Sequence, residues 1–416
     1  MKPITALLII FFSSLIYFIS PFLLPSSSLL STKTPTSINT MATINQDTIA
    51  LINKWVSEDP KAQITIGIDI GATNTRVAVA LCKDGEASSN YSVISKFESD
   101  DADILYPNFA IIGAALPIPA ASACIDAAGP ILDNGTRVII TNWAETKNRE
   151  LRIDLIDERL CPRGKTGLLN DLEAACYGVM ALGEASQLGS YFEDFEDSAK
   201  AVTALAPTRH LVLAMGTGLG VGLLLRRGAN FDVVPTEFGH TLITQYGRTY
   251  PYAAEDAEFI KWLGETVWAG QHLAEFEDVC SGRGLHAAYK WVCRDAPERE
   301  AEKMMPKDIA ELAKKGDKMA VDAMFLHYKF LFRVAQNICV GMQTKGVILA
   351  GDNQVFNNWF VQGEKERLMS EFKWHPKQNP KDKWLDGIPI YVQTKSVNTN
   401  MIGCICKGKI IVAENH

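Results

Sequence analysis

The sequence predicts an α/β protein with a weak internal duplication. Short β-rich segments alternate with helical segments along its 416 residues, as in proteins whose sheets are covered by helices. A strand, a Gly/Thr turn and a second strand follow one another at residues 64–82 and again at 210–225. This echo indicates duplicated halves that face a shared cleft. The length allows two domains and a large buried core.

The first half contains the better defined of the two hairpins. A short amphipathic helix at residues 47–56 is expected to precede it. Gly71 lies between the two strands of the hairpin, which are predicted at 64–69 and 76–82. Further strands are expected at 121–126, 137–140 and 167–170, and the last of them runs directly into a helix at 171–182.

The second half repeats the pattern and adds a long helix. Apolar runs at 210–215 and 221–225 flank a glycine-rich turn. Residues 317–344 then carry apolar side chains on one face, which is typical of a helix packed on a core. Gly346 is expected to end this helix, and residues 347–350 to form the next strand.

Domain boundaries follow from these patterns. Residues 41–62 are expected to form an N-terminal helix and linker. Residues 63–181, together with 396–416, are expected to form a small α/β domain, and 182–395 a large one. Within the large domain, the acidic insertion at 186–207 is interpreted as a surface loop.

The first forty residues do not resemble the rest. Residues 4–24 carry no charge, and a Ser/Thr/Pro-rich stretch follows as far as Thr40. One interpretation is a signal, anchor or membrane helix that takes the protein to a membrane or an organelle. The other is that translation starts at Met41 and the working protein lacks this leader. Membrane contact is expected only if the leader is retained.

Composition limits the classes of partner. Lys and Arg total 41 against 48 Asp and Glu, a formal net charge of −7, and no strongly basic block occurs. Nucleic acid is therefore not expected as a partner. The nine cysteines are irregularly spaced and include no C-x-x-C pair. They predict reduced, mostly buried thiols in a cytoplasmic protein rather than a disulfide framework.

The turn of the first hairpin, D-I-G-A-T-N-T-R, has the residue types of a phosphate site. Gly71 lets the chain reverse with its N–H groups facing outward. Thr73 and Asn74 add donors, and Arg76 can reach phosphate oxygens. Asp69 is placed to hold hydrated Mg²⁺, which prefers carboxylates and keeps several waters. The structural alternative is an ordinary hairpin with polar turn residues, which would contain similar residue types.

The second turn, G-T-G-L-G, occupies residues 216–220 between two apolar runs. It lacks the Lys-Ser/Thr ending of a P-loop, and a strand rather than a helix follows it, so it does not match the dinucleotide fingerprint. Each turn alone is a weak signal. Together they predict opposite walls of one polyphosphate cleft.

Between the two turns lies a strand-to-helix junction with the letters L-N-D. It presents Asn170 and Asp171 at the carboxyl end of the sheet, where α/β proteins bind their ligands. Asp171 is a candidate general base toward a hydroxyl, and Asn170 is a candidate for orienting a sugar. The structural alternative is a helix N-cap, for which Asn and Asp are both common.

Three later residues are suited to a polyol. Glu237 and His240, separated by a short turn with Gly239, offer acceptors and donors for vicinal hydroxyls, and Glu277 adds another carboxylate before a Ser-Gly turn. A pocket of hydrogen-bonding groups discriminates strongly against ligands that lack hydroxyls. Each residue alone is equally compatible with a solvated or structural role.

The ordered set D-I-G-A-T-N-T-R, L-N-D, G-T-G-L-G, E-F-G-H and E-D-V-C-S-G resembles the bacterial-type glucokinases of the actin/hexokinase/Hsp70 superfamily. The resemblance implies an actin-like, ribonuclease H-like ATPase fold of two domains with a central cleft. It implies that Asp171 is the catalytic base and that the sugar is held by Asn170, Glu237, His240 and Glu277. It implies ATP contacts at Asp69, Gly71, Thr73, Asn74, Arg76, Gly216, Thr217, Gly218, Gly220 and Gly351.

The adenosine-side turn departs from the family pattern. The family usually has A-G-G there, whereas this chain has Ala350-Gly351-Asp352-Asn353, which leaves the phosphoryl donor open.

The implied activity is transfer of the ATP γ-phosphoryl group to the 6-hydroxyl of glucose, the first step of glycolysis. Mg²⁺ is expected near Asp69 through water, and a homodimer is expected. The alternatives are a kinase of another hexose, a sugar sensor without catalysis, and an ATPase with a protein client.

Overall fold

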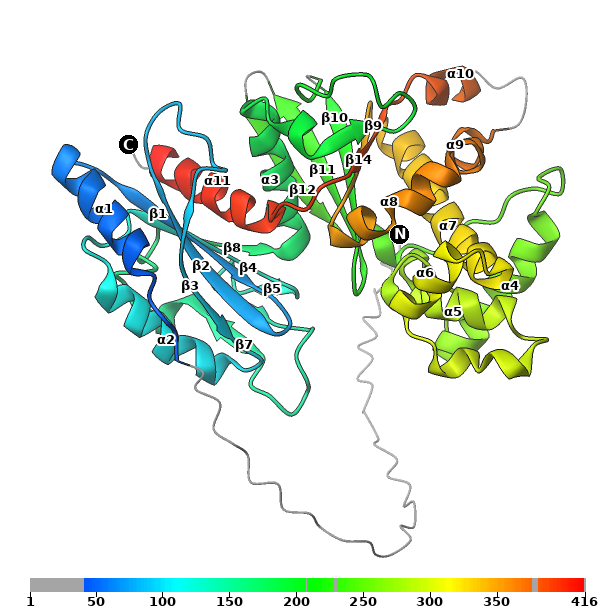
Figure 1. Ribbon diagram of the computed structural model, residues 1–416, viewed down its shortest axis with the longest axis horizontal. Coiled ribbons are helices and arrows are strands. Elements are labelled where there is room, and N and C mark those ends of the chain that lie inside the picture. The colour runs from blue at the N-terminus through cyan, green and yellow to red at the C-terminus, as the bar shows by residue number, and fades with distance from the viewer. Residues whose placement is uncertain (1–40, 207, 228–229, 376–380, 415–416) are drawn as a thin grey trace, which may run out of the picture. The chain divides into compact units, whose positions relative to one another are not determined.

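The computed structural model describes residues 41–206, 208–227, 230–375 and 381–414 (Figure 1). The apolar leader at 1–40 lies outside the described residues, as does every expectation about it. None of the helices within the described ranges combines the length and apolar character needed to cross a bilayer.

The first sheet carries the predicted hairpin at its centre. Its strands, in spatial order, are β3 (Ser92–Glu98), β2 (Asn74–Leu81), β1 (Ile64–Ile70), β4 (Ser122–Ala127) and β8 (Thr166–Asn170). Strand β1 is antiparallel to β2 and parallel to β4, and β4 is parallel to β8. Because the carboxyl ends of parallel strands meet at one edge, Asp69, Asp126 and Asn170 all reach the same edge of the sheet.

The second sheet has a matching order. Its strands are β12 (Asn230–Thr236), β11 (Leu219–Arg227), β10 (Arg209–Met215), β13 (Val347–Ala350), β14 (Ile390–Gln393) and β9 (Phe192–Asp194). Strands β10 and β11 form an antiparallel hairpin, and β13 adds in parallel beside β10, just as β4 does beside β1. The two-fold echo expected from the sequence is thereby confirmed.

A short antiparallel ribbon and the helices complete the fold. The ribbon consists of β5 (Ile131–Leu132), β6 (Arg137–Ile139) and β7 (Glu150–Arg152). The helices are α1 (Gln46–Glu58), α2 (Ala102–Ala115), α3 (Asp171–Glu184), α4 (Ala253–Trp268), α5 (Gly282–Val292), α6 (Pro306–Lys314), α7 (Lys318–Met342), α8 (Asp352–Gly363), α9 (Lys365–Lys373), α10 (Lys381–Asp386) and α11 (Thr399–Glu414). Single 3-10 turns occur at η3 (Phe238–His240) and η4 (Phe276–Asp278), among other places.

The C-terminal helix packs far back along the chain. Helix α11 lies against α3 and against strands β1 and β4 of the first sheet (Figure 1). Buried side chains of α3 and α11 share one apolar cluster with Val212, Leu224 and Ile348 of the second sheet. The two sheets are therefore joined through a continuous core, which fixes the edge of one relative to the edge of the other.

Two sequence expectations need correction. The long helix ends at Met342, and Gln343 takes the left-handed conformation (φ 51°) at its C-cap, so Gly346 does not end it. The insertion at 186–207 is not simply a surface loop, because it supplies β9, which pairs with β14. Phe192 and Phe195 are fully buried there, and their burial outweighs the acidic composition on which the prediction was based.

The cysteines are mostly buried, as predicted. All nine lie in the described part of the chain as free thiols, and only Cys82 among them is half-buried rather than buried.

Candidate active site

A cavity of about 1040 Å³ opens where the edges of the two sheets meet. The first sheet contributes the junction of β8 and α3, and the second contributes the turn between β10 and β11 together with η3 and η4. The predicted residues that line it are Asn170, Asp171, Gly216, Thr217, Gly218, Gly220, Glu237, His240, Glu277 and Gly351. Residues distant in sequence thus converge on one space of a size suited to a hexose and a nucleotide.

Asn170 is the N-cap of helix α3, and Asp171 is the first residue of that helix. The backbone N–H of Leu172 donates to Oδ1 of Asn170 and to Oδ1 of Asp171, each at 2.9 Å. The N-cap considered from the sequence is therefore the structural role of Asn170. It does not exclude a ligand role for either residue, because the bond to Leu172 uses only Oδ1 of each. Within the described ranges, Oδ2 of Asp171 and the amide nitrogen of Asn170 have no hydrogen-bond partner and remain available to a substrate.

The surroundings of Asp171 raise the pKa of its carboxyl above the ordinary aspartate range. Burial by the walls of the cleft raises the pKa of its carboxyl, although the Leu172 amide opposes this effect. The negative charges of Asp69 and Glu237 raise it further. A carboxylate with a raised pKa accepts a proton from a hydroxyl more readily than an ordinary aspartate does.

The residues predicted to bind sugar hydroxyls cluster around η3 and η4. His240 Nδ1 lies 2.8 Å from Oε2 of Glu275, and its Nε2 lies 4.0 Å from a carboxylate oxygen of Glu237 and from one of Glu277. The hydrogen bond with Glu275 raises the pKa of His240, and the charges of the other two carboxylates act in the same direction. Sequence reasoning missed Glu275, although its place two residues before Glu277 was a usable signal.

Glu277 connects this cluster with the glycine turn. Its Oε2 accepts the backbone N–H of Leu219 at 3.0 Å, and its Oε1 accepts Arg283 Nη2 at 2.5 Å. The turn fits only because residue 218 is glycine: a Cβ there would lie 2.4 Å from Oε2 of Glu277. Arg283, which the sequence reading missed, is the one Lys or Arg among the described residues that line the cavity.

The first turn lies at the same sheet edge but outside the described lining of the cavity. Arg76 Nη1 donates to Oδ2 of Asp69 at 3.0 Å, so the predicted phosphate arginine contacts the predicted magnesium carboxylate. Gly71 N–H donates to the carbonyl of Asn74 and closes the turn, while the Asn74 amide donates to the hydroxyl of Thr73. These residues form an ordered hairpin turn beside the cavity.

A third carboxylate, Asp126, lies beside Asp69 and was not predicted. It is the register neighbour of Asp69 across β1 and β4 and is almost fully buried. The side chains of Asn400 and Cys404 each donate to it at 3.2 Å. Burial raises its pKa well above the ordinary range, and the charge of Asp69 adds to that effect. The available signal was a carboxylate near the end of an apolar strand, as at Asp69.

The adenosine-side turn is positioned by a glycine in a conformation that other residues rarely adopt. Gly351 has φ 98°, and its N–H donates to Oε1 of Gln393 at 2.8 Å. Helix α8 begins at the next residue, Asp352, which lines the cavity together with Asn353. The N-terminus of α8, which no side chain caps, therefore lies at the wall of the cavity.

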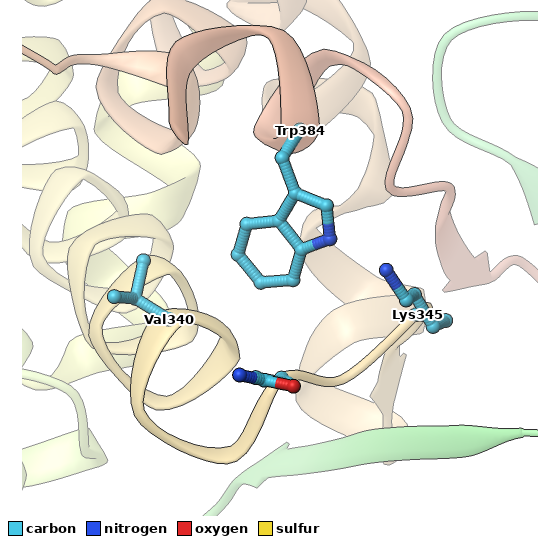
Figure 2. Close-up of a pocket in the computed structure, with 4 residues that line it drawn as sticks. Val340, Lys345 and Trp384 are labelled. Carbon is cyan, nitrogen blue, oxygen red and sulfur yellow. The ribbon is translucent and has the colours of Figure 1, made fainter. Parts of the chain in front are cut away.

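A second cavity of about 290 Å³ has no evident part in this chemistry. Figure 2 shows Val340, Lys345 and Trp384 around it, and Gln343 completes its lining. Lys345 Nζ lies 5.1 Å from the centre of the Trp384 ring, a cation–π contact. Among the described residues, no carboxylate lines this second cavity, so the candidate active site is the larger cavity.

Paired sheets of matching order, with a buried carboxylate and a cluster of hydrogen-bonding side chains at their shared edge, are the features of one class, the sugar kinases with the actin-like ATPase fold. Comparison with known proteins identifies the family within this class. A family model described as Glucokinase matches residues 66–404. The chain belongs to the glucokinase family.

Relatives agree with this assignment. The chain is 33% identical over 374 residues to "Probable glucokinase 2" of Trichomonas vaginalis, and the match covers 85% of this chain and 94% of the relative. Among solved structures, glucokinase from Balamuthia mandrillaris in complex with glucose is 34% identical, with a TM-score of 0.77 over 88% of this chain and all of that one. Leishmania braziliensis glucokinase, at 24% identity and a TM-score of 0.71, shares the fold over 86% of this chain and 97% of its own length.

Proposed function

We propose that the protein is a glucokinase that transfers the γ-phosphoryl group of ATP to the 6-hydroxyl of glucose, giving glucose 6-phosphate, the first step of glycolysis. The observation that carries the proposal is the Asp171 carboxylate, which keeps one oxygen free in the cavity and has a raised pKa. The solved relative from Balamuthia mandrillaris, which is described in complex with glucose, supports the choice of sugar.

The chain's own residues divide the work as follows. Asn170, Glu237, His240 and Glu277 bind and orient the sugar hydroxyls, and Asp171 accepts the proton from the attacking hydroxyl. The N–H groups of Thr217 and Gly218 would face the phosphates, because those of Gly216 and Leu219 already donate to the Gly218 carbonyl and to Glu277. Because the charged side chains of the lining are mostly acidic, with Arg283 as its one Lys or Arg among the described residues, backbone donors must supply much of the phosphate binding. Positioning and charge stabilisation then account for most of the rate, as in phosphoryl transfer generally.

Mg²⁺ fits Asp69 in this scheme. The Asp69 carboxylate is held by donors on Oδ2 alone, which leaves an anionic oxygen for the water shell of a hard cation. Magnesium is commonly bound by one or two carboxylates together with substrate phosphates and waters. When bound, it would neutralise phosphate charge.

The proposal includes a domain division, a location in the cell and an oligomeric state. Two domains, 63–181 with 396–416 and 182–395, are supported by one large apolar cluster within residues 52–168 and another within 195–392. A cytoplasmic location is supported by the free, buried thiols. A homodimer rests on the family resemblance.

The direct test is ADP release by the purified protein with Mg-ATP across a panel of glucose, mannose, fructose and glucosamine. The expected result is the highest kcat/KM with glucose and negligible ADP release without sugar. A higher kcat/KM with another hexose would reassign the acceptor. Sugar-independent ADP release would contradict the kinase and favour an ATPase.

A further inference from the structure

Asn398 has an unusual position between the two sheets. It follows β14 of the second sheet and immediately precedes Thr399, the first residue of α11, which packs on the first sheet. Both the oxygen and the nitrogen of its side-chain amide form hydrogen bonds. Oδ1 accepts the backbone N–H of Met401 at 2.9 Å, and Nδ2 donates to Oδ2 of Asp69 at 2.7 Å. The N-cap bond thus fixes the plane of the amide that reaches the carboxylate.

The donors that hold Asp69 converge on one of its oxygens. Arg76 Nη1 and Asn398 Nδ2 both donate to Oδ2, and no donor in the described part of the chain reaches Oδ1. The terminal torsion of an aspartate is soft, so a carboxylate without such donors would rotate freely. Arg76 is a long side chain that is 41% exposed, whereas Asn398 is short and tied to the start of α11. Asn398 is therefore the stiffer of the two restraints.

We propose that Asn398 is a positioning residue for the magnesium contact of this kinase. It holds Oδ2 of Asp69 so that Oδ1 stays aimed at the water shell of the cation that accompanies the nucleotide. Asn400, two residues further on, lines the cavity, which places this restraint at the edge of the site. The inference rests on the proposed role of Asp69. Hydrogen bonds to a ligating carboxylate commonly tune metal affinity in this way.

The substitution Asn398→Ser separates positioning from helix capping. Serine is a good N-cap, so it retains the bond to the Met401 N–H, but its hydroxyl is too short to reach Asp69 as well. Asn45→Ser is the matched control, because Asn45 caps α1 with its Oδ1 and its amide nitrogen donates to the Val93 carbonyl rather than to Asp69.

The measurement is the affinity of the full-length protein·ADP complex for Mn²⁺, a spectroscopic substitute for Mg²⁺, determined by electron paramagnetic resonance. Asn398→Ser is expected to weaken it about 10-fold or more, the usual effect of losing a partner of a ligating group. The melting temperature of Asn398→Ser should fall by no more than about 2 °C. The Mg²⁺ concentration for half-maximal activity should rise in parallel, while the glucose Kd stays unchanged.

Asp69→Asn distinguishes failure of this inference from failure of the proposed function. If Asp69→Asn weakens Mn²⁺ binding but Asn398→Ser binds it like the wild type, the positioning role is wrong and the magnesium role of Asp69 stands. If Asp69→Asn also binds Mn²⁺ like the wild type, the magnesium role itself is wrong and the inference falls with it. An equal loss in Asn45→Ser would show a non-specific effect and would also overturn the proposal.

Discussion

Replacing Gly218 by alanine tests the link between the glycine turn and the sugar cluster. A Cβ at this position would lie 2.4 Å from Oε2 of Glu277 and 3.0 Å from its Cδ. The carboxylate must then move by about 1 Å to reach an ordinary contact distance of about 3.5 Å. That movement breaks the 3.0 Å hydrogen bond from the Leu219 N–H to Oε2. A hydrogen bond to a charged group contributes about 1.5–3 kcal/mol, so kcat/KM for glucose should fall about 10- to 150-fold.

The assay is coupled ADP release at varied glucose, with the glucose Kd measured by titration calorimetry. Gly216→Ala is the matched control for the Kd, because it makes the same change in the same turn and a Cβ there meets nothing within 4 Å. Its glucose Kd should stay within about twofold of the wild type, since the energy change expected at such a site is below about 0.5 kcal/mol. A Gly218→Ala protein with wild-type glucose Kd and kcat/KM would refute the reasoning.

The other predictions concern the base, the histidine and the insertion. Because the pKa of Asp171 is raised and a base acts only when deprotonated, kcat/KM should fall with decreasing pH, with a midpoint above the ordinary aspartate range. A pH–rate profile with its midpoint inside that range would contradict this prediction. Glu275→Gln should raise the KM for glucose about fivefold, because a neutral partner forms a hydrogen bond with His240 that is weaker by about 1 kcal/mol. Steady-state kinetics measures this KM, and an unchanged value would contradict a role of Glu275 in holding His240 for the sugar. Phe195→Ala should lower the free energy of unfolding by about 3–5 kcal/mol because Phe195 is fully buried, whereas Ser198→Ala, at an exposed position of the same insertion, should change it by less than about 0.5 kcal/mol. Equal free energies of unfolding for the two variants in urea would restore the surface-loop interpretation.

Features that depend on local pattern could be predicted from the sequence. The junction at Asp171 is an example, because an apolar strand gives way there to a helical period within a few residues. The repeated strand–turn–strand echo was visible for the same reason, since each hairpin is continuous in sequence. The insertion at 186–207 misled the prediction because its acidic residues outnumber two aromatics that nevertheless decide its packing.

Features that depend on register between distant segments could not be predicted. Asn398 meets Asp69 across 329 residues of sequence, and Asn400 meets Asp126 across 274. Neither asparagine stands in a motif, and only the packing of α11 on the first sheet brings them to the strand ends. Arg283 could not be predicted either, because a lone arginine at the start of a helix indicates only a solvated side chain, and its contact with Glu277 is known only from the structure.

The central claim is that Asp171 takes the proton from the sugar hydroxyl. Asp171→Asn tests it most directly, because the amide oxygen keeps the cap to Leu172 and only the basic oxygen is lost. The account predicts that kcat falls about 10²- to 10⁴-fold, the usual contribution of a general base, while the glucose Kd changes by no more than a few-fold. A variant that turns over glucose at the wild-type kcat would contradict the account.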